Sequence, residues 1–123
     1  MKLRFLVITA LAALVGALAL VAPAAAITNS PSTITIQRDQ FGFHGVVSNP
    51  GPPACQSNRL VSVHRRNGSN NQFLGSDHTN ATGFWSVEAT VHHGTYFAVV
   101  HRRVLPSRNV VCQAAVSRAI TVD

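Results

Sequence analysis

The sequence has very little negative charge and, after Lys2, no lysine. Only four of its 123 residues are Asp or Glu, and they are scattered along the chain. Glycoside hydrolases need two carboxylates at a set separation, and this sequence offers no candidate pair. The Gly-x-Ser-x-Gly nucleophile elbow is also missing. We therefore expect a protein that is not an enzyme and that carries no cofactor.

The first 26 residues have the three parts of a secretory signal peptide. A basic start, residues 1–4, precedes a mostly apolar run, residues 5–22, and a small-residue site, residues 24–26. We expect cleavage after Ala26 and secretion of the remaining chain to the extracellular space. The alternative is a retained membrane helix. That alternative is weaker because Pro23 interrupts the helix and no basic flank follows it.

The exported part keeps a modest basic excess. Of ten Lys and Arg residues, Lys2 and Arg4 leave with the signal, so eight arginines face four acidic residues, a net charge of +4. Nucleic-acid binders usually concentrate Lys and Arg on one face and place aromatic residues among them. The excess is small and the chain is expected to be exported. We therefore expect no nucleic-acid partner, and rather an extracellular anionic polymer, glycan or protein.

Cysteine is as scarce as negative charge, since Cys55 and Cys112 are the only two. An even number of cysteines in an exported domain favours an intramolecular disulfide over free thiols or intermolecular bridges. Such a bridge closes a loop of roughly 60 residues and stabilises the fold by about 4 kcal/mol.

Apolar residues alternate with period 2, and no stretch shows a helical stripe. Residues 27–32 are mostly polar and predict a flexible leader, whereas turn signals such as residues 48–53 separate the alternating segments. The pattern predicts one antiparallel β-sandwich of about seven strands over residues 33–123. Strands are expected at residues 33–36, 41–47, 59–66, 84–91, 95–103, 110–115 and 116–122, with a short edge strand at residues 73–74.

Four short motifs occur in a characteristic order. They are Phe43-x-Gly45-x-Val47, Val61-x-Val63 before Asn67-Gly68, the run from Thr79 to Val87, and Gly94-Thr95-Tyr96. Over about residues 41–122 this order resembles the prealbumin-like (transthyretin-like) sandwiches, which include carboxypeptidase regulatory-like domains and the B-type repeats of collagen adhesins. The resemblance implies a prealbumin-like fold. The lysine-to-asparagine isopeptide bond common in those adhesin repeats cannot form here, because no lysine follows Lys2.

The chain is rich in histidine, with six in all. A zinc site needs three or four ligands at about 2 Å from one ion. No His-x-x-x-His spacing or paired Cys-x-x-Cys exists, and His92 and His93 would point to opposite sides of a strand. We therefore expect solvated histidines and no metal. A remote alternative is a metal-dependent hydrolase that uses Asp77, His78 and the His92-His93 turn.

The string VHRR occurs twice, at residues 63–66 and 100–103. In sandwiches of the resembled type the two strands that carry it are antiparallel neighbours. Such pairing places His64 across from Phe97 or Ala98, and the two HRR ends about 15 Å apart at about 3.3 Å per residue. The outward face would then carry the candidate ligand-binding residues, which are His64, Arg66, Phe97, His101 and Arg103.

The predicted function follows from these exclusions and from that face. We expect a secreted, non-catalytic β-sandwich module that binds or adheres outside the cell through a basic sheet face. The alanine-rich signal and the exclusive use of arginine after residue 4 favour a bacterial source. The alternative is a structural or stress-protective envelope protein with no specific ligand.

Overall fold

The computed structural model describes residues 26–123, so the expected signal peptide, apart from Ala26, lies outside the described residues. The described residues form twelve strands and two 3₁₀ helices, and the all-β fold expected from the alternation is confirmed. None of their helices is long and apolar enough to cross a membrane. The elements are β1 (Thr28–Ser30), β2 (Thr33–Ile34), β3 (Gln37–Asp39), β4 (Gly42–Ser48), η1 (Pro53–Cys55), β5 (Leu60–Asn67), β6 (Asn70–His78), β7 (Phe84–Glu88), β8 (Gly94–Val100), β9 (Arg103–Leu105), η2 (Pro106–Arg108), β10 (Val110–Cys112), β11 (Ala115–Val116) and β12 (Ile120–Val122).

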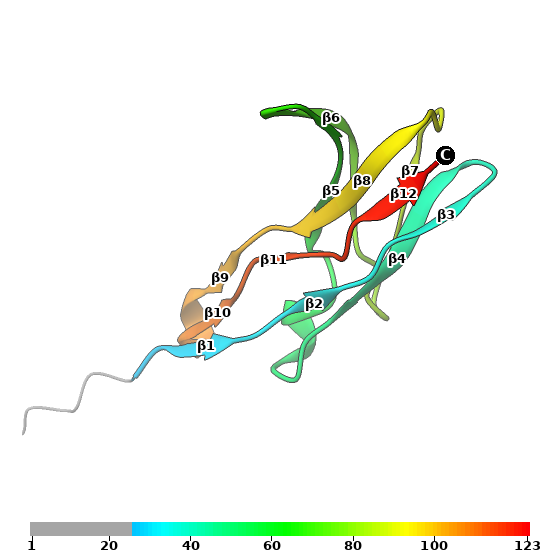
Figure 1. Cartoon of the computed structure of the whole chain (residues 1–123). Coiled ribbons are helices and arrows are strands. Elements are labelled where there is room, and N and C mark those ends of the chain that lie inside the picture. The colour runs from blue at the N-terminus through cyan, green and yellow to red at the C-terminus, as the bar shows by residue number, and fades with distance from the viewer. Residues whose placement is uncertain (1–25) are drawn as a thin grey trace, which may run out of the picture.

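Two of the three sheets pack against each other (Figure 1). The five-stranded sheet has the order β11-β8-β5-β6, and β12 also pairs with β8. The four-stranded sheet has the order β2-β4-β3, and β7 also pairs with β4. A third sheet, β1-β10-β9, extends from one end of this sandwich (Figure 1).

The core lies between the two larger sheets and follows the period-2 alternation of the strands. On β7, Trp85 is fully buried and Val87 nearly so, whereas their neighbours face solvent. Phe43 and Tyr96, from opposite sheets, bring their ring centroids to 4.8 Å. Aromatic pairs at this separation add to the stabilisation from burial alone. The remaining core residues are Ile34, Ile36, Val47, Val61, Val63, Ala98 and Val100.

Two glycines of the sequence motifs are required by close backbone approaches. Gly45 pairs with Trp85, and a Cβ on Gly45 would lie 1.9 Å from the carbonyl oxygen of Thr35. Gly83 has a φ of 85°, and a Cβ there would lie 2.1 Å from the carbonyl oxygen of Val47. An alanine at either position would displace β4 from its neighbours.

The strand β6 is much longer than expected. The sequence predicted only a short edge strand at residues 73–74, but Asn70–His78 pairs with β5 along its whole length. A two-residue turn joins the strands, and only its first residue, Gly68, has a positive φ, at 60°. This is the type II′ geometry that suits a hairpin. The mostly polar sequence of β6 has no alternation of apolar and polar residues that would predict a strand. Its hydrogen bonds with β5 hold it in the sheet instead.

The N-terminal segment also differs from expectation. Residues 27–32 were expected to form a flexible leader, but β1 pairs in parallel with β10. Ser30 is buried, and its carbonyl oxygen accepts hydrogen bonds from the backbone N of Gln113 and the side chain of Asn49. Backbone hydrogen bonds therefore order a segment whose side chains carry no alternation signal.

The expected strand at residues 95–103 is divided. The chain leaves the five-stranded sheet after Val100 and enters the three-stranded sheet at Arg103. The next expected strand, at residues 110–115, is divided in the same way. Its first part, β10, belongs to the three-stranded sheet, whereas β11 belongs to the five-stranded sheet. The alternation of inward and outward side chains therefore does not extend past Val100.

Cys55 and Cys112 form the expected disulfide, and both are fully buried. The bridge connects η1 to the end of β10 across 57 residues of sequence. It fastens the three-stranded sheet to the loop that precedes β5.

The side chain of Arg59, immediately before β5, is also fully buried. Its Nη1 donates to the carbonyl oxygen of Cys55 at 2.6 Å and to Oγ of Ser32 at 3.0 Å. Its Nη2 donates to the carbonyl oxygens of His101 at 2.8 Å and Gln113 at 3.0 Å. No carboxylate among residues 26–123 contacts it, and burial lowers the pKa of the guanidinium. One cation therefore joins four segments that are distant in sequence.

Removal of the disulfide tests its contribution to stability. We expect Cys55→Ala/Cys112→Ala to lower the free energy of unfolding by about 4 kcal/mol, because the unfolded chain regains the entropy of the closed loop. Denaturant unfolding monitored by tryptophan fluorescence measures the loss. The wild-type protein with its disulfide reduced is the matched control, and identical unfolding curves for oxidised and reduced protein would contradict the prediction.

Substitution of Arg59 tests the buried cation. We expect Arg59→Ala to lower the free energy of unfolding by about 3 kcal/mol, because it leaves the carbonyl oxygens of Cys55, His101 and Gln113 without their donor and removes a fully buried side chain. Arg59→Lys should restore little, since an ammonium cannot reach all four acceptors. The exposed Arg108→Ala is the control, with an expected change within about 0.5 kcal/mol. Full stability in the lysine variant would contradict this account.

Candidate binding face

The outward surface of β5, β6 and β8 gathers most of the residues singled out by the sequence. Val61 and Val63 are fully buried, so their neighbours on β5 face outward. The register places His64 opposite Phe97 on one side and Phe73 on the other. We call this surface the basic face. It consists of Leu60, Ser62, His64, Arg66, Phe73, Ser76, His78, Phe97, Val99 and His101.

Ser62 lies at the centre of the basic face, beneath two histidines. Its Oγ is 2.8 Å from Nε2 of His64 and 2.8 Å from Nε2 of His101. The sequence had predicted HRR ends about 15 Å apart. The two imidazoles instead meet at one hydroxyl, because His64 on β5 and His101 just after β8 both direct Nε2 towards Ser62. The two histidines therefore form one cluster.

Aromatic rings surround His64. Its imidazole stacks on Phe97 with centroids 5.3 Å apart and meets the edge of Phe73 at 5.8 Å. The guanidinium carbon of Arg66 lies 5.6 Å from the centroid of Phe97, within reach of a cation–π interaction. The cluster therefore combines a cation, two imidazoles and two phenyl rings. Phe73 is 59 % exposed and remains open to a partner.

The environment of His64 disfavours its charged form. Burial of the ring, followed by the nearby His101, lowers the pKa of His64 below its ordinary value of about 6.5. Protonation of His64 therefore costs free energy in the folded protein.

Arg103 does not lie on the basic face, although the sequence placed it there. Its Nη1 donates to the carbonyl oxygens of Ala54 and Ser57, both at 3.1 Å. The strand leaves the sheet after Val100, so the alternation that predicted an outward Arg103 ends before this residue. Arg103 instead secures the loop that contains the disulfide.

The basic face carries no carboxylate. Asp39 and Glu88 belong to the other large sheet, and Asp123 follows β12. Asp77 lies on β6 but faces the opposite way, with its Oδ2 accepting a hydrogen bond from the backbone N of Ser86 on β7. The one ion pair among residues 26–123 joins His44 to Asp39. Arg66 therefore has no acidic partner in the described part of the chain.

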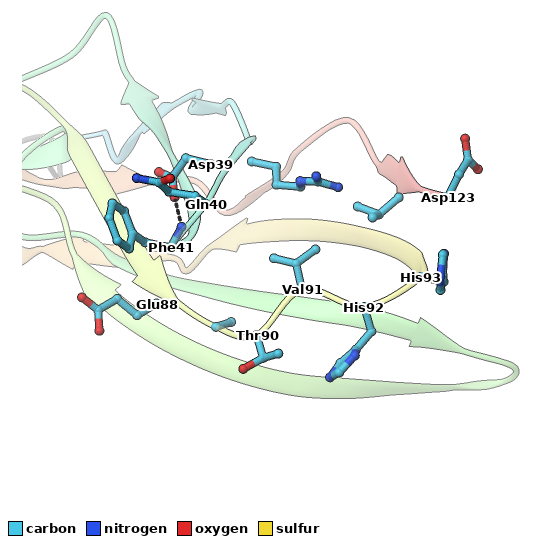
Figure 2. Close-up of a pocket in the computed structure, with 12 residues that line it drawn as sticks. Asp39, Gln40, Phe41, Glu88, Thr90, Val91, His92, His93 and Asp123 are labelled. Atoms are coloured by element: carbon cyan, nitrogen blue, oxygen red, sulfur yellow. Dashed lines mark hydrogen bonds between the residues drawn. The ribbon is translucent and has the colours of Figure 1, made fainter.

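An open cleft at one end of the sandwich is a second candidate. It has a volume of about 900 Å³ and lies between the β3–β4 turn, the segment after β7 and the end of β12. Its rim carries charges of both signs, among them Arg38, Glu88 and Asp123. Figure 2 shows the rings of His92 and His93 lying apart. Within residues 26–123, no three His, Cys, Asp or Glu side chains are grouped to hold a metal ion.

The cleft has one arginine, Arg38, against three carboxylates, Asp39, Glu88 and Asp123, whereas the charge of the basic face is positive. The basic face is therefore the better candidate for binding an anionic partner. A scan against protein-family models and searches of curated proteins and of solved structures find no match to the chain. The chemistry of the face thus carries the functional argument alone.

Phe73, Ser76 and His78, the members of the basic face on β6, were not among the candidate ligand-binding residues from the sequence, and neither was Ser62. The sequence predicted only a two-residue strand in place of β6. The Gly68-Ser69 pair was the available signal, because a glycine at the first central position is typical of a two-residue type II′ hairpin turn. A hairpin at this point would have placed β6 beside β5.

The lowered pKa of His64 predicts how stability depends on pH. In the window between the folded pKa and the ordinary value of about 6.5, the unfolded chain binds more protons, so stability falls as pH falls. We expect His64→Gln to reduce the loss of unfolding free energy between pH values of about 7.5 and 5, measured by denaturant unfolding. The control His92→Gln, at an exposed position, should lose as much unfolding free energy over this pH range as the wild-type protein. Equal losses in all three proteins would contradict the assignment.

Proposed function

We propose that the chain is a secreted, non-catalytic β-sandwich module that binds an extended anionic polysaccharide through its basic face. The observation that best supports this proposal is that the exposed Arg66 lies over Phe97 on a surface without any carboxylate. A cation without an acidic neighbour attracts sulfate or carboxylate groups, and the exposed ring of Phe73 offers a flat apolar surface to sugars.

The layout of the face favours an extended partner. Its residues are spread over three neighbouring strands, from His101 at one end to Arg66 at the other. Strands lie about 4.8 Å apart and rise about 3.3 Å per residue, so the face spans several sugar units of a polymer. A small anion would contact only part of it.

The remaining parts of the proposal concern fold family and location. The order of the motifs, with Gly45 against Trp85 and Gly83 opening β7, supports a prealbumin-like sandwich. The disulfide supports export, because oxidising compartments favour such bonds. The alanine-rich N-terminal segment supports a bacterial signal peptide that is cleaved after Ala26.

Binding to dextran sulfate, with uncharged dextran as the polymer control, tests the function. We expect calorimetry at neutral pH to show that Arg66→Ser weakens binding about tenfold, the equivalent of about 1.4 kcal/mol. Phe97→Ala should also weaken it, since both the ring and the support of Arg66 are lost.

The matched control is Arg108→Ser, which removes the same charge from an exposed position in η2. Its expected effect is less than about twofold, because a distant surface charge changes only the general attraction. Equal losses in both arginine variants would show that affinity follows net charge alone. No binding of dextran sulfate by the wild-type protein would favour a structural envelope protein without a specific ligand.

A further inference from the structure

We infer that His64, Ser62 and His101 form a proton-linked oxyanion site, so that the basic face holds the sulfate or carboxylate groups of its partner more tightly as pH falls. This inference rests on the proposed function, because it concerns how the same face holds its ligand. It assigns a specific role to the histidine pair, distinct from the fixed charge of Arg66.

The argument begins with the single proton of the Ser62 hydroxyl. Oγ contacts the Nε2 atoms of both rings and has no other hydrogen-bond partner among residues 26–123. A hydroxyl can donate to only one of them, so it must accept from the other. When both rings are neutral, one therefore carries its hydrogen on Nε2 and the other on Nδ1. Ser62 thus fixes opposite tautomers in the two rings.

The outer nitrogens of the rings differ as a result. Nδ1 of neither His64 nor His101 has a hydrogen-bond partner among the described residues. In the neutral pair one Nδ1 is a donor and the other is a lone pair. A lone pair repels an oxyanion, so the neutral pair offers the anion only one hydrogen bond.

One proton changes this arrangement without disturbing Ser62. If it adds to the Nδ1 lone pair, both rings present N–H groups at Nδ1, and the hydrogen bonds to Oγ stay as they are. Each ring then presents one N–H donor at Nδ1, and the pair carries one positive charge, which suits the successive oxyanions of a polymer. A second proton would need to displace the serine hydrogen and would face the charge of the first ring. The second proton is therefore harder to add than the first.

The surroundings oppose the proton, and only an outside anion can neutralise it. Arg66 on β5, His78 on β6 and Arg102 after His101 are the neighbouring charged or titratable groups. The buried Arg59 lies beneath, bonded to the carbonyl oxygen of His101. Asp77 on β6 faces the other way, and β11 contributes no charged residue.

The lowered pKa of His64 fits this balance of charges. An anion that stabilises the charged pair raises its pKa, and by linkage the protonated protein must then bind that anion more tightly.

Binding of dextran sulfate at two pH values tests the inference, because its sulfate groups stay ionised throughout. At constant ionic strength we expect wild-type affinity to rise about tenfold between pH values of about 7.5 and 5.5, the effect of one pKa unit. His64→Gln/His101→Gln should show a rise below about twofold. His92→Gln/His93→Gln, which removes two histidines from the cleft, should keep the wild-type rise.

Titration of the histidine ring signals by nuclear magnetic resonance gives a readout that needs no ligand. We expect the His64–His101 pair to bind one proton in the first step and the second only at clearly lower pH. Ser62→Ala should remove this coupling while His92 and His93 titrate as before. Independent titration of His64 and His101 in the wild-type protein would overturn the inference.

The outcomes separate the two proposals. Suppose that Arg66→Ser weakens binding, but that lowering the pH raises the affinity of the wild-type protein no more than that of the His64→Gln/His101→Gln variant. The inference of a proton-linked site is then wrong, and the proposed function stands. If the wild-type protein binds dextran sulfate at neither pH, both are wrong.

Discussion

The fold depends on one buried cation that has no anion. Arg59 is withdrawn from water, and without a carboxylate nearby it is held by three carbonyl oxygens and one hydroxyl. Burial of a charge is costly unless hydrogen bonds compensate it, so the four segments that bind Nη1 and Nη2 must meet around it, while Nε has no partner among the described residues. The Cys55–Cys112 bridge fastens two of the same segments by a covalent bond. Together they attach the three-stranded sheet to the sandwich.

That constraint reaches the basic face through His101. Its carbonyl oxygen accepts from Arg59 and its backbone N donates to Leu60 at 2.9 Å, so its main chain is fixed on both sides beside β5. The side chain of His101 is thereby directed over Ser62 on β5. His64, two residues further along the same strand, contacts the same hydroxyl. The same interaction that closes the fold thus positions half of the histidine pair.

The arginines divide into two groups by what surrounds them. Arg59 and Arg103 are turned towards backbone carbonyls and hold the loop around the disulfide. Arg65 donates to the carbonyl oxygen of His93 and lies 6.0 Å from the ring centroid of Tyr96. Arg66 alone of these four meets an aromatic ring on an open face. Main-chain oxygens accept hydrogen bonds from Arg59, Arg65 and Arg103, and Arg66 is the arginine of the basic face that is open to a partner.

The sequence by itself determined the all-β class and the buried residues of β5, β7 and β8, because the alternation of apolar and polar residues is visible within each strand. It also determined the disulfide, because two cysteines allow only one intramolecular pairing. The family resemblance predicted that the two strands pair and that His64 lies across from Phe97 or Ala98, and the register places it opposite Phe97. Only the tertiary structure decided that β1 and β6 are strands, because their polar residues are ordered by partners distant in sequence. It likewise decided that His101 joins His64 while Arg103 leaves, since a side chain's direction past the end of a strand depends on the sheet that the chain enters next.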